Sequence, residues 1–411
     1  MANNISASFA AKWSKRMQLK LFHTDVFRDL ANFEEQPVLT KGQVVHRPYR
    51  SSLVVNTMGA TGSFQRQDIT DTDETLTVGT PKECSFYIQD IDVIESNYAT
   101  QNLYADDAGR ALSNGIDGDF QAQVANALNT VDDADFGGTS GNGVTVTEAN
   151  VYRMFSLANR KLDNRNAPPV GRFACLSPEF CSILEDYLVN RETDWGDTVG
   201  ERGYVGMYKG FAIYKTLAAY STYVLGVATE PTDGDTVTIN LPDLQGTRTT
   251  ITFTFKTTIG STAGNVLIGG SASAANTNLT ALINAPSVTT AQGVALSATA
   301  QALLATTVAT AAATTTSIAV TGKSFAVVGA TLTATTDGWT TATQIQHQMF
   351  GVKQLCVDVV IQVEPKMLVK SRDGYVGSDI VSWDAYGMKT FQEGARNMVD
   401  VRMRADQLTA S

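Results

Sequence analysis

One stretch, Cys84 to Leu128, constrains the fold most, because it reads as a strand that runs into a single long helix. In its first part Cys84, Phe86 and Ile88 alternate with more polar residues, which is the period of a half-buried strand. Further on, apolar residues recur at steps of four and predict one buried helix stripe: Ala108, Leu112, Ile116, Phe120, Val124 and Leu128. A helix from Ser96 to Leu128 would be about 50 Å long.

Three glycines interrupt this predicted helix: Gly109, Gly115 and Gly118. Each costs a helix about 1 kcal/mol relative to alanine. Either close packing or a bend must therefore account for them, and the sequence leaves both explanations open.

Length and composition indicate a soluble protein of more than one domain. A chain of 411 residues is long enough for two or three domains with a sizeable core, and 43% hydrophobic with 18% charged residues is typical of globular proteins. No apolar run is long enough to span a bilayer, and basic residues interrupt the N-terminal segment where a signal peptide would need an apolar core. We therefore expect synthesis in the cytoplasm and no membrane partner.

The formal net charge of −10 argues against nucleic-acid binding over the general surface, because phosphates repel an acidic protein. A local exception is the amphipathic segment from Ser6 to Phe33, which predicts a helix or a pair of helices. Its first half is basic, with Lys12, Lys15, Arg16 and Lys20. This half is either a solvated surface or an arm that lies on a neighbouring subunit or faces an anionic partner.

Residues 41–82 read as strands and turns with few apolar residues to bury, with strands expected on either side of Arg47 to Arg50. A two-stranded excursion without a core is only marginally stable alone, so we expect it to lie on a partner. Its charged residues are candidates for pairing between neighbouring copies, with a merely solvated face as the alternative: Arg47, Arg50, Arg66, Asp68, Asp71, Asp73 and Glu74.

The remainder divides by composition. Residues 132–223 predict a compact α+β unit, in which the strand Arg172 to Leu176 precedes a helix capped by Ser177. From about Tyr223 the chain becomes rich in Thr and Ala, and its alternating segments favour a separate, mostly β domain over a disordered linker. Strands are expected at Val294 to Ala298 and, where the earlier character returns, over Val352 to Val363. The middle domain is therefore an insertion.

Nothing in the sequence indicates catalysis, a metal or a cofactor. Nucleophile-elbow, P-loop and zinc-protease motifs are missing, and the spaced glycines of Gly200 to Gly206 open no helix after a clear strand. Asp233 and Asp235 resemble a fragment of a calcium loop but are better explained by a turn. The four cysteines form no CxxC pair and read as free structural thiols, and the three histidines share no ligand spacing.

In element order the chain resembles the major capsid (coat) proteins of tailed bacteriophages, which have the Hong Kong 97-like or Johnson fold. The matching segments include Cys84 to Val93 with the helix after it, Leu176 to Phe180, and Asp384 to Lys389. The likeness covers nearly the whole chain as a pattern of elements, without one diagnostic motif. It implies an N-arm (1–40), an E-loop (41–82), a peripheral strand and spine helix (83–131), an axial domain (132–223), an inserted β-rich domain (224–345) as in some podovirus coat proteins, and a return through the axial and peripheral domains (346–411).

The resemblance implies an α+β structural protein of the virion. It would self-assemble in the host cytoplasm into hexamers and pentamers of an icosahedral head. Its implied partners are a scaffolding protein, a portal, a decoration protein and, non-specifically on the inner face, packaged double-stranded DNA. The alternatives are an encapsulin-type compartment shell and a phage tail or adhesin component, which would form trimers or fibres.

Overall fold

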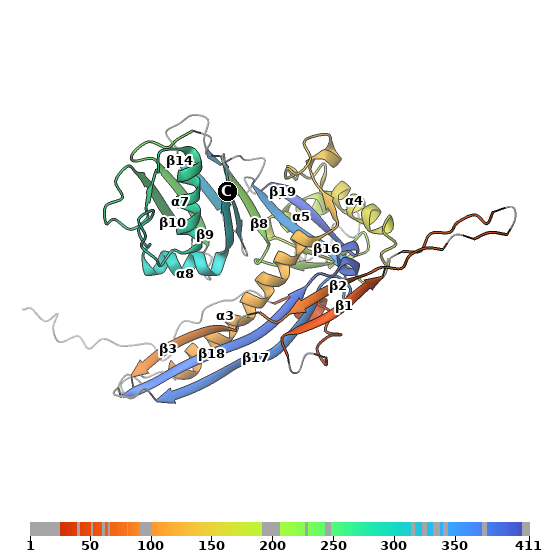
Figure 1. Ribbon diagram of the computed structural model, residues 1–411, viewed down its shortest axis with the longest axis horizontal. Coiled ribbons are helices and arrows are strands. Elements are labelled where there is room, and N and C mark those ends of the chain that lie inside the picture. Colours follow the sequence, from red (N-terminus) through yellow and green to blue (C-terminus); the bar gives the residue numbers. More distant parts are fainter. Residues whose placement is uncertain are drawn as a thin grey trace, which may run out of the picture.

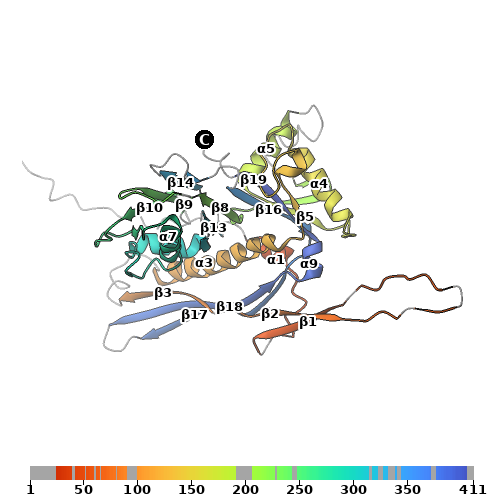
Figure 2. The same ribbon diagram turned by 45° about the horizontal axis from the view of Figure 1, so that its top comes forward.

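The computed structural model describes residues 25–38, 42–50, 52–59, 62–64, 66–79, 81–89, 100–190, 206–226, 229–242, 248–313, 317–322, 327–331, 338–339, 344–371 and 376–404. They form an elongated base, two lobes and a projecting arm (Figure 1). The base is a long sheet with helix α3 (Thr100–Ala122) along it, and both lobes lie on the α3 side of this sheet (Figure 2).

The base sheet has three antiparallel strands in the order β17 (Asp358–Ser371), β18 (Gly377–Lys389) and β3 (Lys82–Gln89). In β3, Ile88 is buried while Ser85 is exposed, so the predicted alternation is confirmed. Helix α3 buries the predicted apolar stripe against the sheet: Ala108, Leu112, Ile116 and Phe120.

The predicted end of the helix at Leu128 is wrong. Helix α3 ends at Ala122, a 3-10 turn η2 (Gln123–Asn126) follows, and the Leu128 side chain is exposed. The chain leaves the helical path before Leu128, because the Leu128 N–H donates to the Ala395 carbonyl (3.0 Å) and the next residues join a sheet as β4 (Asn129–Val131). The described helix is therefore about 35 Å long, and its predicted start at Ser96 lies outside the described residues.

A short helix, α1 (Phe27–Leu30), packs on α3 through one buried carboxylate. Asp117 of α3 accepts hydrogen bonds from the backbone N–H groups of Val26 and Phe27, both at 3.1 Å. These N–H groups belong to the first turn, which has no partners within its own helix. The rest of the helical segment predicted from Ser6 lies mostly outside the described residues.

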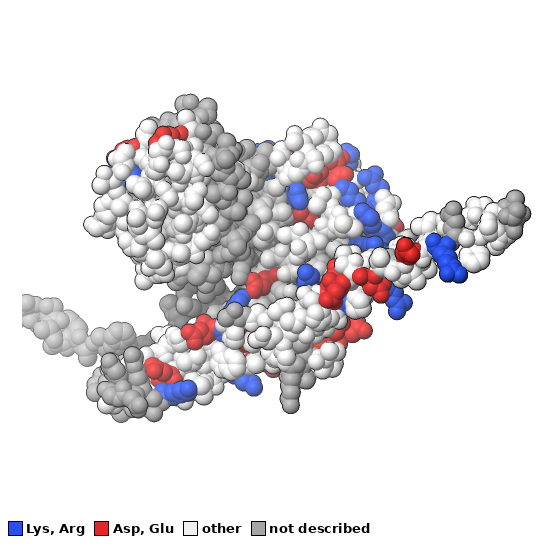
Figure 3. Space-filling model, viewed as in Figure 1, with Lys and Arg blue, Asp and Glu red and all other residues white. Residues whose placement is uncertain are grey.

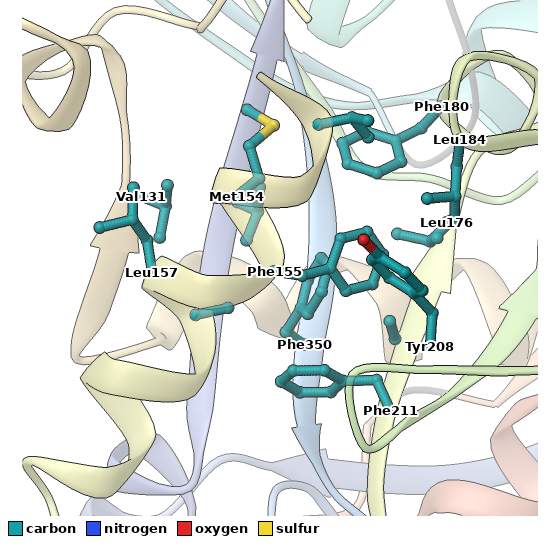
Figure 4. Packing of buried hydrophobic residues seen from close by; sticks show 14 of the residues in the cluster. Val131, Met154, Phe155, Leu157, Leu176, Phe180, Leu184, Tyr208, Phe211 and Phe350 are labelled. Carbon is teal, nitrogen blue, oxygen red and sulfur yellow. The ribbon is translucent and has the colours of Figure 1, made fainter. Parts of the chain in front are cut away.

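The mixed lobe is built on a sheet that includes β4, and its elements alternate along the chain. They are η3 (Asp133–Phe136), α4 (Val151–Asp163), β5 (Arg172–Leu176), α5 (Pro178–Val189), β6 (Met207–Tyr208), β7 (Phe211–Lys215), β16 (Ile345–Val352) and β19 (Met398–Arg404). Its core centres on Phe155 of α4, whose ring lies 4.9 Å from Tyr208 and 5.1 Å from Phe350 (Figure 4). As predicted, Ser177 caps α5.

The structure corrects the strand expected over Val352 to Val363. Strand β16 ends at Val352, and β17 begins only at Asp358. Between them Gln354 has a φ of 59°, and its N–H donates to the Leu30 carbonyl (2.8 Å). The chain must leave the sheet of the mixed lobe here and enter the base sheet, so one apolar run serves two sheets.

The third lobe has its own core under a four-stranded sheet in the order β11-β10-β9-β14. Its elements are β8 (Ser221–Gly226), β9 (Thr236–Pro242), β10 (Arg248–Lys256), β11 (Asn265–Leu267), α7 (Ala272–Asn284), α8 (Ala298–Thr307), β12 (Val308–Ala313), β13 (Ser317–Gly322), β14 (Val327–Thr331) and β15 (Gly338–Trp339). The strand expected at Val294 to Ala298 is wrong, because this segment is irregular and leads into the alanine-rich α8.

The third lobe and the mixed lobe share a sheet. Strand β13 pairs with β8, and β8 pairs with the start of β16, where Ser221 lies opposite Gln346. Next to this joint, Nδ1 of buried His347 lies 2.8 Å from Asp400 Oδ1 and Nε2 lies 2.9 Å from Thr222 Oγ1. The third lobe is thus hydrogen-bonded to its host, although its core is separate.

Candidate assembly surface

A two-stranded arm, residues 42–79, leaves the body and extends well beyond it (Figures 1 and 2). Strand β1 (Val44–Arg50) pairs with β2 (Asp71–Thr77) in an antiparallel ladder from Val44 opposite Thr77 to Arg50 opposite Asp71. Strand β1 thus runs straight through the segment expected to separate two strands. Pro48 is tolerated because β1 has a partner on one side only, so its missing N–H can face outward.

Beyond this ladder the described arm residues have no regular secondary structure. Side-chain and backbone hydrogen bonds join the two segments of the arm here: the Val54 N–H donates to Gln67 Oε1 (2.8 Å), Gln67 Nε2 donates to the Val54 carbonyl, and the Gly59 N–H donates to the Ser63 carbonyl (3.0 Å). The distal arm is therefore thin, and its own subunit covers neither face.

Large apolar side chains crowd this uncovered part of the arm. Six of them are between 65% and 98% exposed: Leu53, Val54, Val55, Met58, Phe64 and Ile69. Sequence reasoning missed them because the segment as a whole is poor in apolar residues, although the run Leu53-Val54-Val55 was a usable signal. Contiguous exposed apolar surface on a soluble protein marks an interaction site.

At its base the arm is firmly attached to the body. Val45, Leu76 and Val78 of the arm are buried with three residues of the base: Val360, Ala385 and Phe391. The Gly79 N–H donates to the Tyr386 carbonyl (3.0 Å). The arm therefore has an anchored proximal half and an exposed distal half.

Arg47 ties the arm to three other parts of the subunit. Its guanidinium lies 3.4 Å from Asp358 Oδ1, 3.3 Å from Glu393 Oε2 and 4.0 Å from Glu35 Oε1, and it stacks over the ring of Phe391 at 5.1 Å. Arg47 was predicted as a partner for a neighbouring copy; the structure gives it partners within its own chain.

The Asp358 carboxyl at this anchor is 6% exposed. Burial raises its pKa to about 6, and the opposing effects of Arg47 and of a hydrogen bond from Asn32 (2.7 Å) only partly offset that rise. The electrostatics of the arm anchor therefore change as the pH passes through about 6.

The other predicted charges fall into two groups. Asp73 pairs with His46 (2.7 Å), and Glu74 accepts from the Gln392 N–H (3.0 Å), so both have partners in the same chain. The second group is exposed and makes no ion pair within the described part of the chain: Arg50, Arg66, Asp68 and Asp71. The basic residues Lys12, Lys15, Arg16 and Lys20 lie outside the described residues.

The charged residues of the visible face gather along the base, the mixed lobe and the arm, whereas the third lobe is almost uncharged (Figure 3). Its described surface is mainly Thr, Ser, Asn and Ala. On this face the charged side chains therefore belong mainly to the host part of the chain.

Away from the arm, the buried Asp400 carboxylate has its ionic partners inside the fold. Besides His347, Asp400 binds Arg402 Nε (2.8 Å). Burial opposes ionisation of Asp400, but the charges and hydrogen bonds of His347 and Arg402 outweigh it and hold the pKa of Asp400 below its usual value. The four cysteines are free thiols, as predicted, and burial raises the pKa of Cys181 and Cys356 to about 12.

In the described part of the chain, no three His, Cys, Asp or Glu side chains are placed to share a metal ion. Among the same residues, no helix combines the length and the apolar character that a membrane crossing requires.

No protein-family model matches the sequence, and no curated protein matches it. Solved structures do match over the length of the fold. A chain from Mycobacterium phage Che8 is 14% identical, with a TM-score of 0.55 over 96% of both chains. A chain from the capsid structure of the cyanophage P-SCSP1u is 14% identical, with a TM-score of 0.55 over 98% of this chain and 95% of that one. The acid-stable capsid structure of Helicobacter pylori bacteriophage KHP30 gives 7% identity, a TM-score of 0.50 and 98% coverage of both chains.

The chain has the Hong Kong 97-like fold. The α+β fold class predicted from the order of elements is thereby confirmed, with an added β-rich lobe. Near-complete coverage in both directions means that the likeness extends over the base, both lobes and the arm, not over one shared motif. At these identities the Hong Kong 97-like fold is retained while most of the surface residues differ.

Proposed function

We propose that this chain is the major capsid protein of a tailed phage, which self-assembles into hexamers and pentamers of an icosahedral head around double-stranded DNA. One observation carries the proposal: a subunit with this fold presents an apolar arm that its own body does not cover. The chain would then be a structural component of the virion, without catalytic activity or cofactor, assembled in the host cytoplasm.

The arm supplies the driving force for association. Full burial of a Val, Leu, Ile, Met or Phe side chain is worth about 1.5–3 kcal/mol. Six such side chains on one arm therefore offer on the order of 10 kcal/mol before the cost of association. Only another molecule can supply the covering surface, since the arm points away from its own body.

This geometry favours ring closure. A donor arm at one end of a subunit and an acceptor surface elsewhere make a heterologous contact, which closes into rings when the rotation permits. Each contact can be individually weak, because a closed shell engages many of them at once. The arm takes the part of an E-loop in this proposal, and residues 41–82 are its boundaries.

The remaining parts of the chain take roles that follow from the same proposal. The basic residues Lys12, Lys15, Arg16 and Lys20 of the N-arm face a scaffolding protein or the inner lumen. A portal and a decoration protein complete the partners, and the acidic average surface holds DNA by enclosure, without specific contacts. The lobe of residues 224–345 is an inserted domain on the outer surface.

Negative-stain microscopy of the purified protein, with an arm variant, tests this proposal. We expect closed shells from the wild-type chain. In the double variant Val55→Ser/Phe64→Ser the shells should be lost while the subunit remains soluble and folded by circular dichroism. The matched control is Val170→Ser, because Val170 is an 81% exposed apolar residue away from the arm.

The outcomes separate the alternatives. Trimers or fibres from the wild-type chain would indicate a tail or adhesin component, and shells that enclose a protein cargo would indicate an encapsulin-type compartment. Shells from the arm variant as abundant as those from the wild type would contradict the role of the arm.

A further inference from the structure

Arg47 lies at the centre of the ladder at the base of the arm, with neighbours from separate parts of the chain. Its ionic partners are Glu35, in the segment after α1, Asp358, which begins β17, and Glu393 of α9 (Gln392–Arg396). The ring of Phe391 stacks against the same guanidinium. Planar guanidinium groups donate in fixed directions, so contacts on several sides fix the orientation of β1 as well as its position.

Strand β2 makes a further contact with α9 at the position opposite Arg47. Glu74 lies directly across the ladder from Arg47 and accepts a hydrogen bond from the Gln392 N–H (3.0 Å). Both strands of the arm thus contact α9, β1 through Arg47 and β2 through Glu74. The apolar contacts beneath them attach the arm but do not orient it, since burial of apolar surface is non-directional.

We infer that Arg47 is a positioning residue for assembly: it sets the direction in which the arm leaves the subunit, and thereby the curvature of the shell. The inference rests on the proposed function, because direction matters only if the arm binds a neighbour. It assigns Arg47 a role within the subunit in place of the contact between copies that its sequence context predicts.

Charge balance explains why the site depends on this one residue. One guanidinium lies among three carboxylates, and the Asp358 and Glu35 side chains are only 6% and 17% exposed. Without Arg47 these like charges would face one another with little water to screen them. Loss of Arg47 would also remove the ionic contacts that join β1 to α9 and to β17.

The length of the arm amplifies any change at its base. The described distal segment 52–59 has eight residues, which correspond to about 26 Å if extended at 3.3 Å per residue. A rotation of about 10° at the ladder would then move its far end by about 5 Å, comparable to the spacing between neighbouring strands. A contact that depends on side-chain packing cannot follow such a shift.

The test combines hydrogen exchange with particle measurement on Arg47→Met, which removes the charge but keeps most of the side-chain length. In the unassembled fraction we expect at least tenfold faster exchange in residues 44–50 and 71–77, with exchange in β18 unchanged. Arg50→Met is the matched control for exchange, because Arg50 lies on the same strand and makes no ion pair in the described chain. By microscopy, particles of Arg47→Met should vary widely in diameter.

Arg47→Lys gives an intermediate result, because it keeps the charge and loses the planar donors. It also serves if Arg47→Met fails to fold. Wild-type exchange in the ladder together with uniform wild-type diameters would overturn the inference, as would faster exchange throughout the subunit. A wild-type chain that forms no shells would overturn the proposed function instead. Hydrogen exchange in the β1–β2 ladder would still show whether Arg47 fixes the arm to the body.

Discussion

Asp358 gives a quantitative test of the electrostatics at the arm anchor. Its carboxyl has a pKa of about 6 in the folded chain against a usual 3.8, chiefly because it is buried. A raised pKa means that the folded state favours the protonated form. The stability contributed by this group is therefore fully present below about pH 3.8 and is lost as the pH rises through about 6.

The size of the effect follows from the shift in pKa. A difference of about 2.2 units corresponds to about 3 kcal/mol of stability lost by pH 7.5, and about 2 kcal/mol of this develops between pH 4.5 and pH 7.5. Asp358→Asn keeps an oxygen that accepts from Asn32 and Arg47 but carries no charge. We expect the variant to gain about 2 kcal/mol relative to the wild type over that pH interval.

Urea unfolding of the unassembled fraction, followed by tryptophan fluorescence at several pH values, measures this difference. In the Arg47→Met background the difference should grow, because Arg47 is the main group that lowers the pKa of Asp358. A difference between wild type and Asp358→Asn that stays constant from pH 4.5 to pH 7.5 would refute the reasoning.

Two further predictions concern α3 and its surroundings. An added Cβ at Gly109 or Gly115 would have no neighbouring atom within 4 Å outside the helix backbone, so Gly109→Ala/Gly115→Ala should stabilise the subunit by about 2 kcal/mol in urea unfolding. The control Gly143→Ala should destabilise it, because its Cβ would lie 2.9 Å from a backbone nitrogen. Destabilisation by the double substitution would contradict the open space at these two positions. Asp117→Ala should cost about 1–3 kcal/mol by the same measurement, because two N–H groups at the start of α1 lose their acceptor, and no loss would mean that this contact is absent in solution.

Gly109 and Gly115 show what the sequence could indicate about the long helix and what required the structure. Helix propensity made Gly109 and Gly115 anomalous, and close packing or bending were the two explanations. The structure shows open space where a Cβ would lie at both positions, which argues against close packing as the reason for these glycines. The remaining explanation for these two glycines is the conformational freedom of their backbone. A role of this freedom in assembly stays a hypothesis.

The boundary errors have a common cause. Apolar periodicity correctly predicted the buried stripe of α3 but not its end, because Leu128 leaves the helix to reach a carbonyl far along the chain. The apolar run after Val352 likewise divides between two sheets at Gln354. A local pattern reports which residues are apolar, not which of two nearby sheets will bury them.

Local chemistry alone determined much of this protein: the α+β composition, the cap at Ser177, the buried stripe of α3 and the insertion of a β-rich segment into a host. The order of these elements was enough to indicate the capsid fold. Only the tertiary structure decided which charges of the arm face inward. Arg47 and Arg50 are three residues apart and equally basic, yet one lies among three carboxylates and the other lies in solvent. Their difference comes from Glu35, Asp358 and Glu393, which lie far from one another in the chain and meet only when it folds.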